Sequence, residues 1–330
     1  MSDPGSRVIV LTVRGREGHR EPRGDSPPSD RPRRLDLYLA EELGLSRAEA
    51  SLLIVRGGVT VDGRGARKGQ ELSGGETITI DALVMAAEPP IEADPSVPIT
   101  ILYEDAHIVA VEKPPGVACL PNRPGERGTI ANALVAYSPE QARIGGPREA
   151  GLVHRLDTGT SGVLLAARTQ EAYATLRARW SSGEVMKTYL AVIEGVLEEP
   201  GVIDAPIAHH ARSARRMVIA SSPMARSPQP ALTDYVPIGS RDGLTLLLVR
   251  IREGRRHQIR VHLASIGHPV AGDPIYGTKR TPRFEGDTSA GLALHSLGLA
   301  LAHPVSGEPI EITSQFPTRV WSLVMYDEGE

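Results

Sequence analysis

The chain has little cysteine and few aromatic residues. Its 330 residues include one Cys, two Phe and two Trp. A single cysteine excludes an internal disulfide and is typical of a reducing, cytoplasmic compartment. Because aromatic rings are scarce, the core must be built mainly from Val, Leu, Ile and Ala. Cys119 lies in the apolar segment 116–120, so we interpret it as a small buried residue rather than as a nucleophile.

Long apolar runs and a strong charge of one sign are absent as well. No run approaches the roughly 18 residues that a membrane span needs, and no signal-peptide pattern opens the sequence. We therefore expect a soluble, cytoplasmic protein without a membrane partner. The net charge is only −3, but residues 205–260 contain ten Arg against three acidic residues. A charged stretch is usually a solvated surface, so this one supports a nucleic-acid partner only weakly.

Composition divides the sequence into four parts. Residues 1–30 are rich in Gly, Pro, Ser, Arg and Asp, which is typical of a flexible arm. Residues 31–86 predict a small compact domain. Residues 87–98 contain four prolines among acidic residues, which predicts a stiff, extended linker. Residues 99–330 are then expected to form a second, larger domain.

The small domain has the pattern helix, helix, strand, strand. Leucines at helical spacing predict a first helix over 35–43 that ends at Gly44. Ser46 is placed to cap a second helix over 47–56. Alternating apolar and polar residues then predict short strands over 59–62 and 76–80.

This order of elements resembles the S4 RNA-binding domain over nearly its whole length. The segments that carry the resemblance are Arg34-Leu35-Asp36, Ser46-Arg47 and Gly58-Val59-Thr60-Val61-Asp62-Gly63. The resemblance implies that the second helix and the loop after it contact the RNA backbone. The basic residues at the matching positions are Arg47, Arg56, Arg64, Arg67 and Lys68.

The large domain is rich in predicted strands. Strands are expected over 99–103, 107–112, 162–168, 188–194, 244–251 and 293–302. Two helices are expected, over 170–182 and 258–265, each followed by a glycine within two residues. Long strands with few helices between them favour an α+β domain over a doubly wound sheet. The Pro-, Ser- and Arg-rich segment 209–230 predicts a mobile loop.

The most informative segment is 154–162, His-Arg-Leu-Asp-Thr-Gly-Thr-Ser-Gly. It places Asp157 in a tight turn ahead of an apolar strand, where a side chain is held rigidly. Glycines at 151, 159 and 162 can adopt positive φ and allow a ligand to approach closely. Taken alone, an aspartate of this kind is more often a surface residue that caps a turn.

The other segments of the large domain favour the functional interpretation. Segment 154–162 resembles the catalytic signature of the large-ribosomal-subunit type (RluA family) of pseudouridine synthases. Four further segments resemble the same family in order. The first comprises Tyr103-Glu104-Asp105, the strand 107–111 and Lys113-Pro114-Pro115-Gly116, and the others are 187–191, 253–262 and 267–277. Residues 294–296 and 303–304 resemble its C-terminal end. The resemblance covers about residues 99–317 and implies a mixed, mainly antiparallel catalytic sheet.

The resemblance also implies a reaction and roles for five residues. The reaction moves ribose C1′ from uracil N1 to C5 in RNA, without redox change and without a cofactor. Asp157 would be the nucleophile, by attack at C1′ or by way of a glycal, and Arg260 would be its cationic partner. Tyr189 would contact the uracil ring and Ile259 would form an apolar wall. Arg155 would hold the place of the flipped-out nucleotide.

RNA is the expected partner, and a monomer is the expected state. Large-subunit ribosomal RNA is the expected substrate, because members with an S4 domain mostly act on it; a tRNA is the alternative. The chain departs from the family at Arg256, where members often carry Thr or Ser. Its charge fits either RNA backbone binding or an ordinary exposed arginine.

The sequence favours three other interpretations less. A non-catalytic RNA-binding or ribosome-assembly protein would be favoured by loss of Asp157 or Tyr189, and both are present. A glycoside hydrolase needs a second carboxylate near the first; Asp273 is a candidate, but we expect it to brace a turn. The histidines of the large domain lack the close spacing of a zinc site, so no metal is expected.

Overall fold

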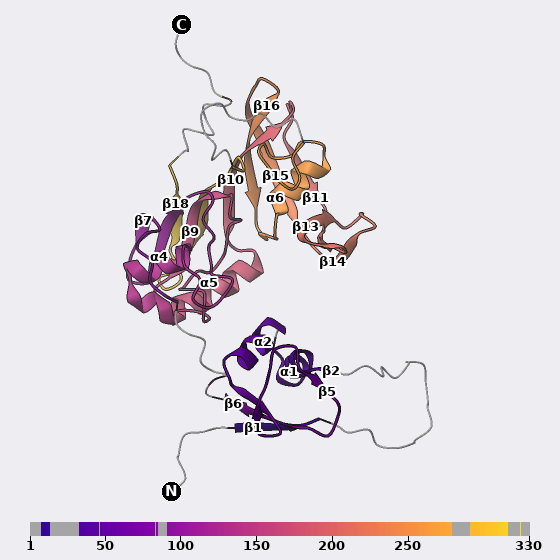
Figure 1. Cartoon of the computed structure of the whole chain (residues 1–330). Helices are drawn as coiled ribbons and strands as arrows, with labels where there is room; N and C mark the ends of the chain where they lie inside the picture. Colours follow the sequence, from indigo (N-terminus) through magenta and orange to yellow (C-terminus); the bar gives the residue numbers. More distant parts are fainter. Residues whose placement is uncertain are drawn as a thin grey trace. The chain divides into compact units, whose positions relative to one another are not determined.

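The chain forms two compact units, Met1–Pro89 and Pro90–Glu330 (Figure 1). The computed structural model describes residues 8–13, 33–45, 47–82, 84, 91–278, 291–315 and 324. None of the helices within these residues is long and apolar enough to cross a membrane.

The first unit packs two helices against a small sheet. Helix α1 is Leu35–Leu43 and ends at Gly44, whose φ is 65°. Helix α2 is Arg47–Val55, so both predicted helices are present, whereas the predicted cap Ser46 lies outside the described residues. The sheet has the order β1-β6-β3-β4, and β2 pairs with β5. The strands are β1 Val8–Thr12, β2 Arg33–Arg34, β3 Val59–Val61, β4 Arg64–Gly65, β5 Glu71–Leu72 and β6 Thr77–Asp81. The buried core includes Leu35, Leu39, Ile78 and Ile80.

Part of the predicted flexible arm is a strand. Residues Val8–Thr12 form β1, which pairs antiparallel with β6 along its whole length. Ile9 and Leu11 are half-buried against the core of the unit, and their neighbours point away from it. This short apolar run therefore forms an edge strand with alternating burial, and the expectation of an arm is wrong for these residues. The rest of the predicted arm, 1–7 and 14–30, lies outside the described residues.

A nine-stranded sheet forms the centre of the second unit. Its order is β11-β15-β16-β10-β17-β9-β8-β7, with β18 paired to β17. Among the described strands of this sheet only β17 and β9 pair in parallel, so the sheet is mixed and mainly antiparallel. The bounds are β7 Thr100–Glu104, β8 Ile108–Lys113, β9 Ser161–Ala167, β10 Met186–Glu194, β11 Gly201–Asp204, β15 Leu232–Arg241, β16 Leu244–Ile251, β17 Leu294–Ala302 and β18 Pro309–Thr313. The six predicted strands are all present, with ends that differ by at most two residues.

Helices of this unit include both that were predicted and two that were not. Helices α5 (Gln170–Ser182) and α6 (Gln258–Ser265) have the predicted bounds. Helix α4 (Ile130–Tyr137) and the short 3-10 helix η1 (Pro139–Arg143) were not predicted. The signal for α4 is Thr129, which forms a reciprocal capping box with the residue three positions later.

The predicted linker is partly core. Within 87–98, residues 91–98 lack regular structure, but Ile91 and Val97 are buried in the main core of the second unit. Prolines indicated an extended chain, yet the apolar residues between them pack on the sheet. This segment therefore belongs to the second unit rather than to a free linker.

The predicted mobile loop over 209–230 is a three-stranded ribbon. It has the order β13-β12-β14, with strands Ile207–His210 (β12), Ser213–Ile219 (β13) and Ala225–Gln229 (β14). Ile207 and Met217 are buried with Val261 of α6, and the Tyr276 hydroxyl accepts a hydrogen bond from the Met217 N–H at 2.7 Å. The expectation of a loop is wrong, because the segment forms paired strands that these contacts hold against α6 and Tyr276.

Candidate active site

Asp157 lies in the loop that leads into β9, and Lys113 holds this loop. The fully buried Lys113 ammonium donates hydrogen bonds to the carbonyl oxygens of Thr158 at 3.0 Å and Thr160 at 2.7 Å, which follow Asp157. A third bond, of 2.9 Å, goes to the Pro114 carbonyl. Burial lowers the pKa of Lys113 to about 8. Three carbonyl acceptors match the three N–H groups of an ammonium, so one cation fixes the loop. We predicted no role for Lys113 from the sequence.

Gly162 brings this loop against strand β17. Its φ is 108°, and a Cβ at this position would lie 2.1 Å from the Ser296 carbonyl oxygen. Gly151 also has a positive φ, of 77°, but Gly159 does not, so the expectation for Gly159 is wrong. A Cβ at Gly159 would lie 3.1 Å from the Cβ of Leu292, which shows that Gly159 serves close packing instead.

One arginine connects Asp157 to a second carboxylate. Arg260 Nη1 donates to Asp157 Oδ2 at 2.6 Å, while Nε and Nη2 donate to the two carboxylate oxygens of Asp273 at 2.7 and 2.8 Å. The Asp273 side chain is completely buried, whereas that of Asp157 is 26% exposed. A bidentate pair has a defined orientation. Asp273 therefore orients the guanidinium, which presents its remaining edge to Asp157. No described residue donates a hydrogen bond to Asp157 Oδ1.

Helix α6 and the turn after it place Arg260 and Asp273. The helix begins directly after His257, whose φ of 56° lies in the left-handed region. Asp273 Oδ1 also accepts hydrogen bonds from the N–H groups of Ile275 and Tyr276, at 2.8 and 3.0 Å. Asp273 therefore braces a turn, as expected. That it also holds Arg260 was not predicted, and the only sequence signal is its place in a matched segment.

Ion pairing affects the pKa values of Arg260 and Asp273 more than burial does. Burial alone would lower the pKa of Arg260, but the hydrogen bond and charge of Asp273, together with the charge of Asp157, raise it above its ordinary value. Burial would raise the pKa of Asp273, and the hydrogen bonds from Arg260 and the turn amides lower it. Arg260 and Asp273 are both charged at neutral pH, so Asp157 has a fixed cation beside it.

His257 approaches Asp157 but carries no charge. Its Nε2 is 3.8 Å from Asp157 Oδ2, and its Nδ1 is 2.9 Å from the Tyr276 hydroxyl oxygen. Burial lowers the pKa of His257 to about 4, despite the opposing effect of Asp157. The imidazole is therefore neutral at pH 7, and Arg260 remains the cationic partner of Asp157.

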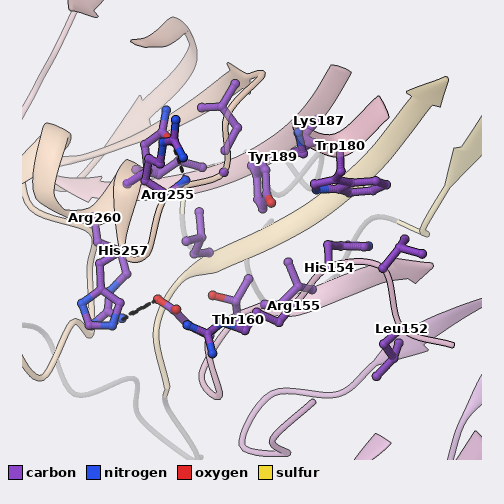
Figure 2. A pocket seen from close by; sticks show the side chains of 18 of the residues that line it. Leu152, His154, Arg155, Thr160, Trp180, Lys187, Tyr189, Arg255, His257 and Arg260 are labelled. Atoms are coloured by element: carbon purple, nitrogen blue, oxygen red, sulfur yellow. Dashed lines mark hydrogen bonds and ion pairs between the residues drawn. The ribbon is translucent and has the colours of Figure 1, made fainter. Parts of the chain in front are cut away.

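A cavity of about 410 Å³ opens at Asp157. It is lined by all five residues that were assigned to catalysis and uridine binding: Asp157, Tyr189, Arg260, Arg155 and Ile259. Figure 2 shows Arg260 and His257 on one side of it, with Tyr189 and Arg155 nearer its middle. Tyr189 and Ile259 are buried, and burial together with the charge of Asp157 raises the pKa of Tyr189. Arg155 is exposed and has no hydrogen bond or ion pair to a described residue.

The opposite wall of this cavity is a column of three side chains (Figure 2). The His154 ring stacks on Trp180 with their centres 4.2 Å apart, and Lys187 Nζ lies 5.0 Å from the Trp180 ring centre. His154 Nε2 accepts a hydrogen bond from the Leu165 N–H at 3.0 Å. Burial lowers the pKa of His154 to about 3, so the ring is neutral. The column supports the chain directly before Arg155, and its assembly was not predicted.

The basic residues predicted to bind RNA lie in the first unit. Arg47 begins α2 and donates to Asp36 Oδ2 at 3.0 Å, although its side chain is 58% exposed. Arg64, Arg67 and Lys68 are exposed on β4 and the turn after it. Arg56 follows α2 and is half-buried.

Histidines of the second unit have structural partners. His262 bonds the Thr233 hydroxyl and the Ala205 carbonyl, both at 2.8 Å. Nδ1 of His268 is 3.0 Å from the Glu194 carbonyl oxygen. Within the described part of the chain, no group of three or more His, Cys, Asp and Glu side chains could hold a metal ion.

Comparison with known proteins assigns both units. The family model described as RNA pseudouridylate synthase matches residues 107–265, and the S4 domain model matches residues 33–78. The ribosomal large subunit pseudouridine synthase D of Nitrosomonas europaea is 39% identical over 245 residues, which cover 74% of this chain and 69% of that protein. The chain belongs to the RNA pseudouridine synthase family. The synthase is an isomerase with an S4 domain before an α+β catalytic domain.

Two further relatives agree. The ribosomal large subunit pseudouridine synthase D of Xanthomonas campestris pv. campestris is 38% identical to the synthase, across 76% of this chain and 73% of that protein. The solved structure of human RNA pseudouridylate synthase domain containing 1 is 28% identical and superposes with a TM-score of 0.57. It covers 70% of this chain, and the match covers 89% of the human chain.

Proposed function

We propose that the synthase isomerises specific uridines of large-subunit ribosomal RNA, with Asp157 as the catalytic nucleophile. The observation that carries this proposal is the asymmetric pairing of Asp157. Arg260 holds one of its oxygens at 2.6 Å, and no described residue donates to the other. Asp157 also lines the cavity that contains Tyr189 and Ile259. A carboxylate that is oriented but only half-occupied can react with a ribose.

The reaction needs little more than this arrangement. It breaks the N1–C1′ bond and forms a C5–C1′ bond, while a proton leaves C5 and a proton is gained at N1. No atom or electron is exchanged with a second reactant, which agrees with a site that needs no cofactor. Attack of Asp157 at C1′, or removal of the C2′ proton to give a glycal, requires a carboxylate within reach of the ribose. Arg260 holds the carboxylate in place for either route.

The other cavity residues handle the base. The Tyr189 ring stacks on the detached uracil, and Ile259 limits its movement while it turns from N1 to C5. Arg155, exposed and without a protein partner among the described residues, enters the RNA structure where the uridine left it. Extruding a base from the stack costs a few kcal/mol, and this insertion and stacking offset that cost.

The S4 domain binds the RNA backbone through Arg47, Arg56, Arg64, Arg67 and Lys68. We propose that the synthase acts as a monomer in the cytoplasm. Large-subunit ribosomal RNA is favoured over tRNA because the two relatives that are 39% and 38% identical are both named for that subunit. A non-catalytic assembly protein is disfavoured because the cavity is complete.

Pseudouridine mapping tests the proposal. Ribosomal RNA and tRNA would be mapped in cells that lack the gene, and again after complementation with the wild type or with Asp157→Ala. The expected result is loss of one or a few pseudouridines from large-subunit ribosomal RNA, restored only by the wild type. Losses confined to tRNA would contradict the substrate, and restoration by Asp157→Ala would contradict the nucleophile.

The role of the S4 domain has its own test, in the salt dependence of RNA binding. Replacing Arg64, Arg67 and Lys68 by Gln is expected to weaken binding and to flatten the slope of log affinity against log salt by about 0.7–0.9 per lost phosphate contact. Arg33→Gln is the control, because Glu41 already pairs with Arg33. An unchanged slope in the triple variant would contradict RNA contact by this turn.

A further inference from the structure

A second cavity, of about 720 Å³, adjoins the first at Asp157. The two cavities share six lining residues, which are Leu120, Arg155, Leu156, Asp157, His257 and Arg260. Tyr189, which lines the first, does not line the second. Asp157 therefore stands where the two meet. A nucleotide with its base in the first cavity and its ribose at Asp157 directs a backbone phosphate into the second.

The second cavity has more positive than negative side chains. Arg155, Arg215 and Arg256 line it, and none of them forms an ion pair with a carboxylate of the described residues. Arg260 also lines it, but it is already held between Asp157 and Asp273. Asp157 is the only acidic residue among the lining residues. Three cations around one cavity repel each other, and an anionic ligand relieves that repulsion.

The ribbon supplies part of this charge and is held in place to do so. Arg256 Nη1 donates a hydrogen bond to the Ala214 carbonyl oxygen at 2.9 Å, and Arg215 is the next residue along β13. The Tyr276 hydroxyl bonds both the Met217 N–H, at 2.7 Å, and His257 Nδ1, at 2.9 Å. The ribbon is thus tied to His257, the residue directly before α6. These contacts set the position of Arg215 relative to Asp157.

We infer that the second cavity is a phosphate subsite, in which Arg215 and Arg256 bind a backbone phosphate next to the uridine that reacts. This inference rests on the proposed function. Guanidinium groups suit the site because each can donate two parallel hydrogen bonds to the oxygens of one phosphate. The ribbon over 207–229 is then part of the substrate site.

Steady-state kinetics on an RNA that contains the mapped uridine test the subsite. Arg215→Gln and Arg256→Gln are each expected to raise KM about tenfold with kcat within about twofold, because a ground-state backbone contact is lost. The control is Arg226→Gln, on β14 of the same ribbon but lining neither cavity; its KM is expected to stay within about twofold. Equal rises in KM for all three variants would show general attraction of RNA and would overturn the subsite.

A neutral linkage identifies the phosphate. In the same RNA, a methylphosphonate would replace the linkage on the 5′ or the 3′ side of the uridine. One of the two is expected to raise the wild-type KM about tenfold and to have no further effect on a variant that carries both Arg215→Gln and Arg256→Gln. Additive effects of linkage and variant would overturn the assignment.

Two controls separate the possible failures. Arg256→Gln also removes the bond to Ala214, whereas Arg215→Gln leaves that bond intact. A rise in KM for Arg256→Gln alone would reduce its role to anchoring the ribbon and would contradict the subsite. Absence of activity in the wild type would count against the proposed function instead.

Discussion

Each unit of the synthase contains an aspartate–arginine cluster of three side chains, and the two clusters have opposite composition. In the S4 domain, one carboxylate takes two arginines: Asp36 accepts bonds from Arg34 at 2.9 and 3.0 Å and from Arg47 at 3.0 Å. In the catalytic domain, one arginine takes two carboxylates, Asp157 and Asp273. Both oxygens of Asp36 accept hydrogen bonds from arginines. In the catalytic domain, Asp273 accepts two hydrogen bonds from Arg260 and Asp157 accepts one, so the second oxygen of Asp157 is left to contact a ligand.

Burial follows the same division. Asp36 is 3% exposed, and the side chains of its two arginines, Arg34 and Arg47, are 40% and 58% exposed. In the catalytic domain the arginine is buried and Asp157 reaches the cavity. The two clusters distinguish a buried carboxylate that is paired with two cations from a carboxylate that lines a cavity and has one oxygen without a donor among the described residues. Arg47 is already paired with Asp36 inside the S4 domain. Its contact with RNA therefore stays a prediction.

The sharpest test of this division is removal of the half-occupied carboxylate. Asp157→Ala is expected to lower the rate of pseudouridine formation on the order of 10⁴-fold or more, as loss of a nucleophile does in other enzymes. Stability should change little, because Arg260 keeps its bidentate bond to Asp273. Single-turnover assays and urea unfolding measure the two effects. If Asp157→Ala keeps its activity, the proposed difference in role between Asp157 and Asp36 is wrong.

Replacement of Asp273, the buried carboxylate of the same cluster, should mainly affect stability. Asp273→Asn is expected to destabilise the protein by about 3–5 kcal/mol, because it leaves a buried guanidinium without its main partner. Urea unfolding measures the loss. A cost below about 1 kcal/mol would show that Asp157 alone can hold Arg260, against the roles assigned here.

The S4 cluster should respond more weakly. Asp36→Asn is expected to cost about 1–3 kcal/mol of local stability, since the released arginines are solvated rather than stranded in a core. Hydrogen exchange of amides in α1 and α2 reports the loss, with amides of β8 and β9 as an internal control. Faster exchange in both groups would mean that the effect is not local to the S4 domain.

Acid should reveal the smallest effect. The hydrogen bond from Arg34, against the opposing effect of burial, lowers the pKa of Asp36 from 3.8 to about 2. Between these values the unfolded chain binds the proton and the folded chain does not, so stability rises with pH in this window. The contribution is complete above about pH 3.8 and is lost as the pH falls towards 2. Hydrogen exchange of amides in α1 should therefore accelerate in the wild type as the pH falls from about 3.8 towards 2. An identical acceleration in Asp36→Asn would assign it to other groups.

Elements with local signals could be predicted from the sequence. Helix α5 has a capping Thr169 at one end and Gly183, with a φ of 76°, at the other, so a few neighbouring residues define it. The ribbon could not be predicted in this way. Its anchor, the bond between Met217 and Tyr276, joins residues 59 positions apart, and its exposed arginines resemble those of a loop.

The site was predictable only in part, for the same reason. Asp157 and Arg260 are 103 positions apart, and no periodicity connects them; the resemblance of two motifs did. Asp273 lies 13 positions after Arg260, but its carboxylate reaches the guanidinium only because the turn folds back onto α6. Lys113 likewise donates to backbone carbonyls. Because every residue has a carbonyl, the sequence does not indicate which residues accept these hydrogen bonds.

Strand β17 has a consequence for how the synthase comes into being. It is among the last strands to be translated, yet it lies between β10 and β9 in the sheet. Until it emerges, Asp157 ahead of β9 and Tyr189 on β10 belong to two pieces with no strand to join them, each with an unpaired backbone edge. Such long-range pairing forms late in folding. Asp157 and Tyr189 are therefore both translated more than a hundred codons before the strand that joins their two parts of the sheet.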